Sequence, residues 1–513
     1  MKNIKYILCL LILVGFTACN DIEDIEEEFL TTGTEVELPA LTAGTADFSN
    51  YVALGASFTA GFSDSALFIA SQENSFPNIL AQQFANAGGG TFTQPLMNDN
   101  LGGIAAGGVQ LPGSSVGPRL VFGGAGPVPI TDLIGPATSS TDLFVNNLTG
   151  PFNNMGVPGA KSFHLLSNSY GNIAGLGVFA NPYFIRMASS SSATMLGDAM
   201  AQAPTFFTLS EIGGNDVLAY ATSGGSGVDQ TGNFDPTTYG SNDITDPNVF
   251  AQAFNAILST LTSTGAKGAV TTIPNITFLP HFTTVPHNPV PLDAATAGAL
   301  NGGYAAYNGG LQAAFAALTG TGLFTAEEVA RRTISFNAGE GNAMVIIDED
   351  LTDLGAINPA FAALPKYRQA TAEDLFVLSL ASLIPQGYGT QIPLEDKWAL
   401  TPEEQNNLQV ATDAYNATIV SLAATNNVAV VDLNDILLQA STTGVSFDDY
   451  TMTASLVTGG LVSLDGIHLT ARGYALIANK FLEAIDATYG SNFIEAGAVA
   501  KAGNYPTNYS PGL

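Results

Sequence analysis

Short apolar runs with the length of β-strands recur along this chain, and patterns typical of helices lie between them. The strand-like runs cover residues 48–57, 205–212, 268–273 and 428–433. The helical patterns cover residues 75–87, 249–261 and 470–489, and a further helix starts at residue 401. Strands that alternate with helices are typical of a parallel sheet covered by helices. The sequence therefore predicts an α/β fold with a mostly parallel sheet.

The helix expected after Thr401 has a strong start signal. Thr401 can cap the helix, Pro402 suits its first position, and Glu404 closes a capping box with Thr401. The run Asp374–Pro385 is a second candidate, a short apolar helix. This run is either a buried structural helix or a lid or acyl-chain wall, and the latter would favour a lipid or long acyl ester as substrate.

The chain is longer than its strands and helices require, and the excess lies in three insertions. They cover residues 88–150, 222–245 and 275–400, and the tail 491–513 has no helical or strand pattern. Structureless loops of this length are unusual in compact domains. We expect the insertions to fold over the active-site edge of one domain that spans residues 48–490.

The chain is strongly acidic, with 44 Asp and Glu against 14 Lys and Arg and a formal net charge of −30. Such a surface repels phosphate backbones, which excludes nucleic acids as partners. It also disfavours docking of the bare protein on anionic lipid. Acidic residues can also bind calcium, but the sequence lacks the spacing of aspartates that is typical of an EF-hand. We expect neither a metal nor a cofactor.

The first 18 residues have the features of a signal peptide. Two lysines precede a short apolar stretch, which ends in Phe16-Thr17-Ala18-Cys19. This ending resembles the lipobox of bacterial lipoproteins, in which the cysteine is lipidated and becomes the first mature residue. The resemblance implies a cell-envelope protein held in a membrane through lipid on Cys19, with the outer membrane as the expected location.

An acidic tether, residues 19–47, follows this cysteine. Its first residues include a run of Asp and Glu that repel one another and stay solvated. Acid-rich stretches behind a lipidated cysteine resemble those of surface lipoproteins in some Gram-negative lineages, so a plain tether and a surface-export signal both stay open. Cys9 leaves with the leader and Cys19 is consumed by lipid, which fits an oxidising compartment.

Two positions at the ends of predicted elements have the residue types for acid–base and nucleophilic chemistry. Asp465 precedes His468 by three residues, on the turn before the terminal helix. A carboxylate at this spacing can fix the tautomer of the imidazole, as a general base requires. Ser57 follows the first strand, at the edge where open parallel sheets place their sites. Taken alone, such a serine is more often a helix cap.

Two further turns offer hydrogen-bond donors. Asn215 follows two glycines after the strand-like run 205–212, and its side-chain amide can donate to an oxyanion. Gly159 lies in another strand-end turn and can offer its backbone N–H. Taken alone, such an asparagine is more often part of an ordinary turn and a helix cap.

Together these residues resemble the SGNH, or GDSL-type, family of esterases and lipases. The four blocks of that family, in its order, are matched by Ser57, Gly159, Asn215 and the pair Asp465 and His468. The resemblance implies a three-layer flavodoxin-like sheet. It also implies that Ser57 is the nucleophile, His468 the general base and Asp465 its partner. The oxyanion hole would be formed by the N–H groups of Ser57 and Gly159 and the side chain of Asn215.

The resemblance spans residues 51–485, with two departures in the nucleophile block. Ala56 stands where the name-giving motif has Asp, and Phe58 where it has Leu. Both departures concern the family subtype more than catalysis, because Ser57 is retained. The implied activity is carboxylester hydrolysis through an acyl-enzyme on Ser57, with acyl esters, including lipids, as substrates.

Two other functions stay open at this stage. A carbohydrate O-deacetylase would use the same residues, although a single tryptophan, Trp398, leaves few aromatic platforms for sugars. A ligand-binding or adhesion lipoprotein on an inactive esterase fold is the alternative of another class. His281 and His287 could ligate zinc, but they lack a supporting Cys or carboxylate at ligand spacing, so loop or pocket-wall roles are favoured.

Overall fold

The computed structural model describes residues 38–145 and 148–513. The predicted leader, the predicted lipidation site Cys19 and the tether up to residue 37 lie outside these described residues. The chain divides into a large unit, residues 41–494 with 498–513, and a small unit formed by residues 1–40 and 495–497. The described part of the small unit consists of turns and irregular backbone.

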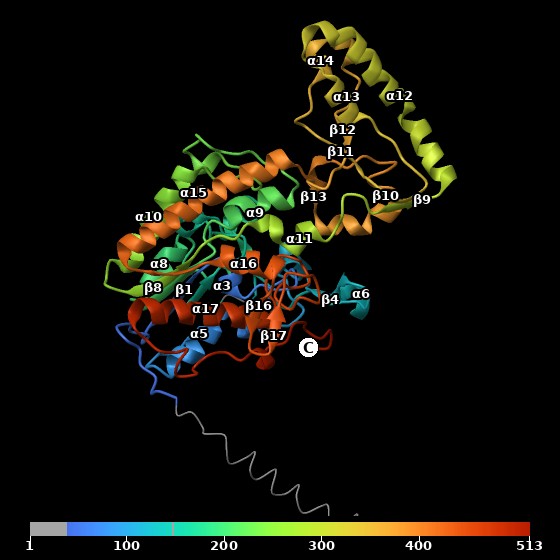
Figure 1. The fold of residues 1–513 in the computed structure, drawn as a ribbon. Helices are drawn as coiled ribbons and strands as arrows, with labels where there is room; N and C mark the ends of the chain where they lie inside the picture. The colour runs from blue at the N-terminus through green and yellow to red at the C-terminus, as the bar shows by residue number, and fades with distance from the viewer. Residues whose placement is uncertain (1–37, 146–147) are drawn as a thin grey trace, which may run out of the picture. The chain divides into compact units, whose positions relative to one another are not determined.

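A parallel sheet of five strands forms the centre of the large unit (Figure 1). Its strands are β1 (Tyr51–Gly55), β6 (Asn154–Gly156), β7 (Phe206–Ser210), β8 (Lys267–Thr271) and β15 (Ala429–Val431). They are ordered β15-β8-β7-β1-β6, and every neighbouring pair is parallel. The predicted α/β fold with a parallel sheet is confirmed.

The strands β1 and β7 lie side by side at the centre of the sheet. Leu54 of β1 and Leu209 of β7 face each other in register and are 0% and 1% exposed. Such burial is typical of parallel strands that are covered on both faces. Gly55 and Ser210, the last residues of the two strands, are also paired. The segments that follow β1 and β7 therefore start next to each other at the carboxyl edge.

Helices cover both faces of the sheet (Figure 1). One face carries α5 (Phe76–Ala85) and α17 (Ala471–Tyr489), and the other carries α9 (Asn215–Thr222), α10 (Pro247–Thr262) and α15 (Pro402–Asn426). Aromatic stacking joins the helices within each layer. Phe76 and Phe481 join α5 to α17 with ring centroids 4.8 Å apart, and Phe250 and Tyr415 join α10 to α15 at 4.3 Å.

The helix α15 begins as the sequence predicts. The Thr401 hydroxyl accepts the backbone N–H of Glu404, and the Glu404 carboxylate accepts the N–H of Thr401 at 2.7 Å. Pro402 occupies the first helical position. The helices predicted at 75–87, 249–261 and 470–489 are confirmed as α5, α10 and α17.

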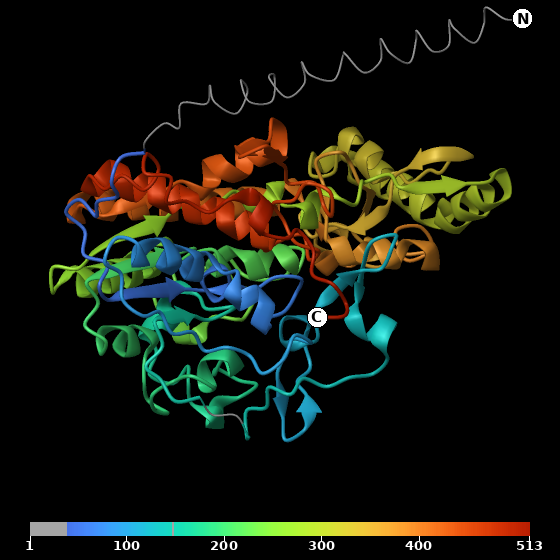
Figure 2. The ribbon, with the colours of Figure 1, turned by 90° about the horizontal axis from the view of Figure 1, so that it is seen from below.

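The insertion at 275–400 contains a lobe with its own hydrophobic core, drawn in yellow and orange in Figures 1 and 2. Its elements are β9 (Val290–Leu292), α12 (Ala294–Leu318), α13 (Ala326–Arg332), β10 (Gly339–Asn342), β11 (Val345–Ile347), α14 (Leu354–Ile357) and β12 (Tyr367–Gln369). Leu311 of α12 and Val345 of β11 are fully buried there. Arg368 is also buried, with ion pairs to Asp348 at 2.5 Å and to Asp374 at 2.6 Å. This part of the insertion is therefore a packed subdomain.

The short helix predicted for Asp374–Pro385 is wrong. Residues Leu375–Phe376 form β13, which pairs with β14 (Ala399–Leu400), and two 3₁₀ turns follow, Leu378–Ser382 and Ile384–Gln386. The cross-strand pairing extends the backbone where the apolar pattern predicted a helix. Phe376 and Leu380 are fully buried in the main core, so the apolar residues of this run serve packing.

The other insertions are mostly irregular. The first contains the hairpins β2–β3 (Ala105–Ala106 and Val109–Gln110) and β4–β5 (Leu120–Phe122 and Pro127–Pro129) and the helix α6 (Ile130–Ile134). Residues 222–245 contain the 3₁₀ turn Pro236–Thr238. The tail 491–513 has one 3₁₀ turn, Ala502–Asn504, as its only helical element, which agrees with its lack of pattern.

The remaining short elements connect these parts. They are α3 (Ser57–Ala60), α4 (Ile69–Glu73), α7 (Pro182–Ile185), α8 (Met195–Met200), α11 (Pro280–Thr283), α16 (Leu433–Thr442), β16 (Val445–Phe447) and β17 (Tyr450–Met452). Within the described residues, no helix combines the length and the apolar character needed to cross a membrane.

Candidate active site

Ser57 lies in a tight turn between β1 and α3. The strand ends at Gly55, and Ser57 is the first residue of the short helix. A Cβ atom at Gly55 would lie 2.0 Å from the Thr59 hydroxyl and 2.7 Å from the carbonyl oxygen of Ser210, so only glycine fits there. This close packing places Ser57 at the carboxyl edge of β1, where it is 6% exposed.

Asp465 and His468 form a hydrogen-bonded pair on the turn before α17. His468 Nδ1 lies 2.8 Å from Asp465 Oδ2, and the backbone N–H groups of Ile467 and His468 donate to Asp465 Oδ1 at 2.8 Å. Burial acts to raise the pKa of Asp465, but the neighbouring imidazole and these hydrogen bonds hold that pKa well below its ordinary value. An ionised carboxylate at Nδ1 requires the proton on that nitrogen, which leaves Nε2 of the neutral ring as an acceptor.

The loop after α3 is bonded to this turn. The N–H of Ser65 donates to Asp465 Oδ2 at 2.9 Å, and the N–H of Leu464 donates to Asp64 Oδ1 at 3.0 Å. The N–H of Asp64 in turn donates to the Ser463 hydroxyl at 3.1 Å. Asp64 and Ser65 have φ angles of 52° and 63°, an uncommon conformation for residues other than glycine. No motif in the sequence pointed to this loop.

One cavity at the carboxyl edge is lined by Ser57, Asn215 and His468. Its volume is about 50 Å³. The other lining residues are mostly apolar: Phe58, Glu211, Gly214, Leu218, Pro274, Ile276, Leu279, Leu433 and Ile467. The cavity lies where segments that follow β1 and β7 meet. The strand order changes direction between these two strands, and such switch points are where open α/β sheets bind ligands.

Asn215 is the first residue of α9, and four residues, Glu211-Ile212-Gly213-Gly214, separate it from the end of β7. Its side-chain Nδ2 donates one hydrogen bond to the carbonyl oxygen of Ala160 at 3.1 Å, which orients the amide and leaves its second hydrogen for another acceptor. Gly213 has a φ of 104°, and a Cβ there would lie 2.3 Å from Ile273, so this turn also requires glycine.

Gly159 is not among the residues that line the cavity. It lies in an exposed turn after β6 with a φ of 80°. The next residue, Ala160, accepts the hydrogen bond from Asn215. The structure therefore brings Ser57, Asn215 and His468 to one cavity, and the predicted role of the Gly159 N–H stays a prediction.

Glu211 is a buried carboxylate in the wall of this cavity that the sequence analysis missed. Its Oε1 accepts the N–H of Ala56 at 2.6 Å and the N–H of Thr59 at 3.2 Å. Burial raises the pKa of Glu211 to about 7, although these hydrogen bonds act to lower it. An acid directly after a buried strand and before Ile-Gly-Gly-Asn215 was the available signal.

A second, apolar cavity of about 30 Å³ adjoins the first. Five residues line both cavities: Phe58, Pro274, Leu279, Leu433 and Ile467. The second cavity continues between α16, the segment that leads into α17, and α17 itself. Its other lining residues are Ile436, Leu437, Leu461, Val462, Leu469 and Ile477. Every side chain along it is apolar.

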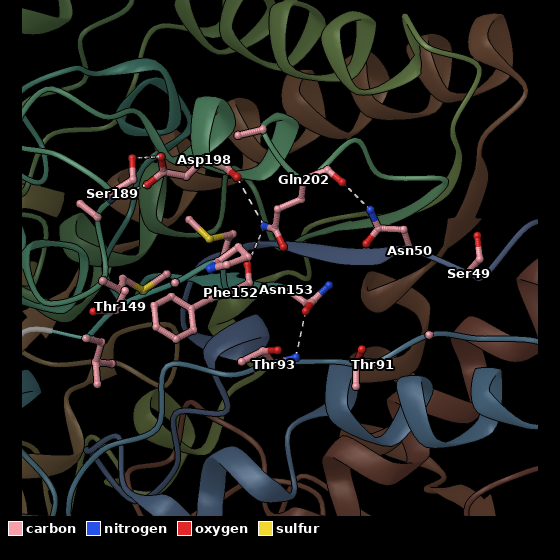
Figure 3. A pocket seen from close by; sticks show the side chains of 18 residues that line it. Ser49, Asn50, Thr91, Thr93, Thr149, Phe152, Asn153, Ser189, Asp198 and Gln202 are labelled. Carbon is pink, nitrogen blue, oxygen red and sulfur yellow. Dashed lines mark hydrogen bonds between the residues drawn. The ribbon is translucent and has the colours of Figure 1, made fainter.

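A larger cleft, of about 790 Å³, lies at the opposite edge of the sheet (Figure 3). It is lined by residues that precede β1 and β6, such as Asn50 and Asn153, and many of its side chains are amides or hydroxyls. Several of these amides bind the protein itself: Gln202 Nε2 donates to the carbonyl of Phe152 at 2.7 Å, and Asn153 Oδ1 accepts the N–H of Thr93 at 2.9 Å. No predicted site residue lines this cleft.

Three carboxylates outside the site could hold a cation. Ligand atoms of Glu349, Asp396 and Glu404 lie within 4.8 Å of one another. Glu404 is already engaged by Thr401 in the helix cap. His281 and His287 do not belong to this group. His281 instead packs behind the Asp465 turn, with Nδ1 3.3 Å from the carbonyl oxygen of Asp465, and burial lowers the pKa of His281.

Comparisons of the chain with protein-family models, with curated proteins and with solved structures find no match. The family resemblance therefore rests on the sequence motifs alone.

Proposed function

We propose that this protein is a serine carboxylester hydrolase of the SGNH, or GDSL, type that cleaves acyl esters through an acyl-enzyme on Ser57. The main observation in favour is that Ser57, Asn215 and His468 line one cavity while Asp465 binds the far nitrogen of His468 at 2.8 Å. A nucleophile, a base and an oriented amide around one space are the groups that acyl transfer requires.

The strand order supports the flavodoxin-like arrangement that the resemblance implies. Numbered along the chain, the strands from β6 to β15 read 2-1-3-4-5 across the sheet. This is the order of flavodoxin-like folds, which place their ligand at the point where the order reverses. Ser57 follows β1, which is strand 1 in this numbering, and Asn215 follows β7, which is strand 3. The order reverses between these two strands.

In the proposed reaction, Nε2 of His468 takes the hydroxyl proton as Ser57 attacks the ester carbonyl carbon. Asp465 fixes the imidazole and stabilises the imidazolium that forms. The free amide hydrogen of Asn215 and the N–H of Ser57 donate to the oxyanion, with the N–H of Gly159 as the third expected donor. His468 then protonates the leaving alcohol, and water releases the acyl group from Ser57 by the same steps in reverse.

The walls of the two adjoining cavities favour an aliphatic acyl group. The shared residues Phe58, Leu279 and Leu433 would contact the first carbons beyond the carbonyl, and Leu437 and Ile477 line the deeper space. Burial of each CH₂ group in such a wall is worth about 0.8 kcal/mol. An acetyl group would leave the second cavity unused, which places a carbohydrate O-deacetylase second. Trp398 lines neither cavity.

The proposal includes location and partners. Lipid on Cys19 would anchor the enzyme in the cell envelope, with the outer membrane favoured, and the acidic run behind it would act as a tether or as a surface-export signal. Acyl-ester lipids of that membrane are the nearest substrates of the proposed class.

The test is hydrolysis of p-nitrophenyl esters with acyl chains of increasing length, by protein without residues 1–19. Ser57→Ala should abolish turnover, whereas Ser75→Ala, which removes another buried serine hydroxyl outside both cavities, should keep it. A fluorophosphonate should label the parent protein and not Ser57→Ala. Folded protein that hydrolyses none of these esters and takes no label would contradict the proposal and favour the ligand-binding alternative.

A further inference from the structure

The turn that carries Ser57 lacks a cap of its own. Ala56 occupies the N-cap position of α3, and its methyl group cannot accept a hydrogen bond. An Asp at this position would accept the N–H of the third helical residue, which here is Thr59. Without an acceptor, the N–H groups of the buried residues Ala56 and Thr59 would stay unpaired, which would destabilise this turn.

Glu211, the residue directly after the neighbouring strand β7, supplies the missing acceptor. Its Oε1 accepts the N–H of Ala56 at 2.6 Å and that of Thr59 at 3.2 Å, and the Thr59 hydroxyl donates to Oε2 at 3.3 Å. These two N–H groups flank Ser57 in the sequence. One carboxylate therefore binds the backbone on both sides of the proposed nucleophile.

The backbone of Glu211 is itself held in an uncommon conformation. Its φ is 47°, in the left-handed region that residues other than glycine seldom adopt. The N–H of Glu211 donates to the Thr271 hydroxyl of β8 at 2.8 Å, which fixes this conformation from the next strand. A strained residue whose carboxylate lines the cavity is typical of a functional site.

We infer that Glu211 is a positioning residue for the nucleophile. From its place directly after β7, it performs the capping role that an acid at position 56 would perform within the turn. The inference rests on the proposed function. Its carboxylate fixes the backbone around Ser57, and thereby the direction of the Ser57 N–H and hydroxyl toward the cavity. Misplacement of a reacting group by about 1 Å can cost about 10²-fold in rate.

Two substitutions of nearly equal size separate hydrogen bonding from packing. Glu211→Gln keeps an oxygen that accepts both N–H groups, so kcat for a p-nitrophenyl ester should stay within about threefold of the parent. Glu211→Met keeps the length of the side chain and loses the acceptor, so kcat should fall about 10–100-fold while KM changes little. Asp348→Asn, a buried carboxylate in the distant lobe, is the control: it should lower the melting temperature and leave kcat unchanged.

The most decisive test moves the acid from position 211 to position 56. Glu211→Ala should lose as much kcat as Glu211→Met, and Ala56→Asp added to Glu211→Ala should recover at least tenfold, because the introduced carboxylate can accept the N–H of Thr59. A Met variant as active as the Gln variant, or a double variant no better than Glu211→Ala, overturns the inference. If Glu211→Met does not fold, Glu211→Asp takes its place, because the shorter side chain of aspartate cannot reach both N–H groups. If Glu211→Asp is then as active as Glu211→Gln, the inference is overturned.

The failure of this inference differs from the failure of the proposed function. Ester hydrolysis that depends on Ser57 but not on an acceptor at position 211 removes only the role of Glu211. If no variant hydrolyses any ester, amide hydrogen exchange at Ala56 and Thr59 still decides the role of Glu211: exchange should be faster in Glu211→Met than in Glu211→Gln, and equal rates overturn it.

Discussion

The carboxylate of Asp465 binds His468 twice: Oδ2 lies 2.8 Å from the imidazole Nδ1, and Oδ1 accepts the backbone N–H of the same residue at 2.8 Å. The imidazole ring and the backbone of His468 are therefore both held by the carboxylate of Asp465. The turn needs no other element to orient the imidazole, and the N–H of Ser65 adds a bond from the loop that follows the nucleophile.

Asp465→Asn should lower kcat by about 10³–10⁴-fold with a small change in KM. An amide in this place can donate to Nδ1, which selects the tautomer with the proton on Nε2 and removes the base. Steady-state hydrolysis of a short p-nitrophenyl ester measures this. Residual activity within tenfold of the parent, in a folded variant, would exclude His468 as the base that Asp465 orients.

Asn215→Ala should lower kcat by about 10²–10³-fold, the usual effect of removing one oxyanion donor. The hydrogen bond to Ala160 is lost as well, so the variant's melting temperature has to be measured beside its rate. Asn479→Ala is a matched control, because Asn479 Nδ2 likewise donates to a backbone carbonyl, that of Ala500 at 3.0 Å, and Asn479 does not line the cavity. Equal losses in the two variants would indicate a purely structural role for Asn215.

Leu437→Trp should shorten the acyl chain that the enzyme prefers. The larger ring would fill the deeper cavity, which Leu437 lines, and would leave Ser57 and His468 untouched. We expect hydrolysis of long-chain esters to fall at least tenfold and that of the acetyl ester to stay within about twofold. Val410→Trp, on an exposed site that is 60% accessible, is the control. An unchanged chain-length profile would place the acyl group elsewhere.

Glu211 and Asp64 should each contribute less to the stability of the fold as the pH rises from 5 to 8. Burial raises the pKa of both Glu211 and Asp64 to about 7, whereas such carboxyls titrate near pH ~4 in an unfolded chain. Their contribution is fully present below the unfolded pKa and is lost as the pH rises through the folded pKa. For each group, every tenfold difference in proton affinity between the folded and unfolded chain changes the free energy of unfolding by at most ~1.4 kcal/mol. The pKa of Asp465 is lowered, so this residue affects stability only at more acidic pH than this range.

Glu211→Gln isolates one of these two groups, because an amide does not titrate. Its melting temperature should fall less between pH 5 and pH 8 than that of the parent, as measured by circular dichroism at constant ionic strength. Parallel curves for the two proteins would contradict the assigned pKa.

Cys19→Ala should release the protein from the membrane fraction of the host in which it is produced, because the proposed lipid has no other attachment point. Labelling with palmitate should be lost in parallel. Ester hydrolysis per molecule should be unchanged, since Cys19 lies far along the chain from every residue of the cavity. A variant that stays labelled and membrane-bound would exclude the proposed anchor.

The sequence predicted those residues of the candidate site whose pattern lies within a few neighbouring positions. Asp465 and His468 are three residues apart, and Ser57 and Asn215 directly follow apolar strands, so their pattern was visible without a structure. Glu211 was missed because its function depends on contact with Ala56, 155 positions away in the chain. Such a contact exists only after β1 and β7 have paired.

The subdomain around α12 was missed for a different reason. This helix contains the glycine pairs Gly302-Gly303 and Gly309-Gly310, which disfavour helices by about 1 kcal/mol per residue. Packing of Leu311 and Tyr307 against the lobe's core offsets that propensity. The run after Asp374 shows the opposite case. Its apolar pattern predicted a helix, but Leu375 pairs with Leu400 in a two-stranded sheet.

The bond between Ser65 and Asp465 joins positions 400 residues apart. Closing a loop of that length costs about 5 kcal/mol of chain entropy, and contacts so distant in sequence form late in folding. The proposed nucleophile Ser57 and the proposed base His468 therefore meet only after the turn that precedes α17 has docked beside the loop after α3. During synthesis and export, every shorter form of the chain would lack one half of the proposed catalytic pair, and the onset of esterase activity would report the last step of folding.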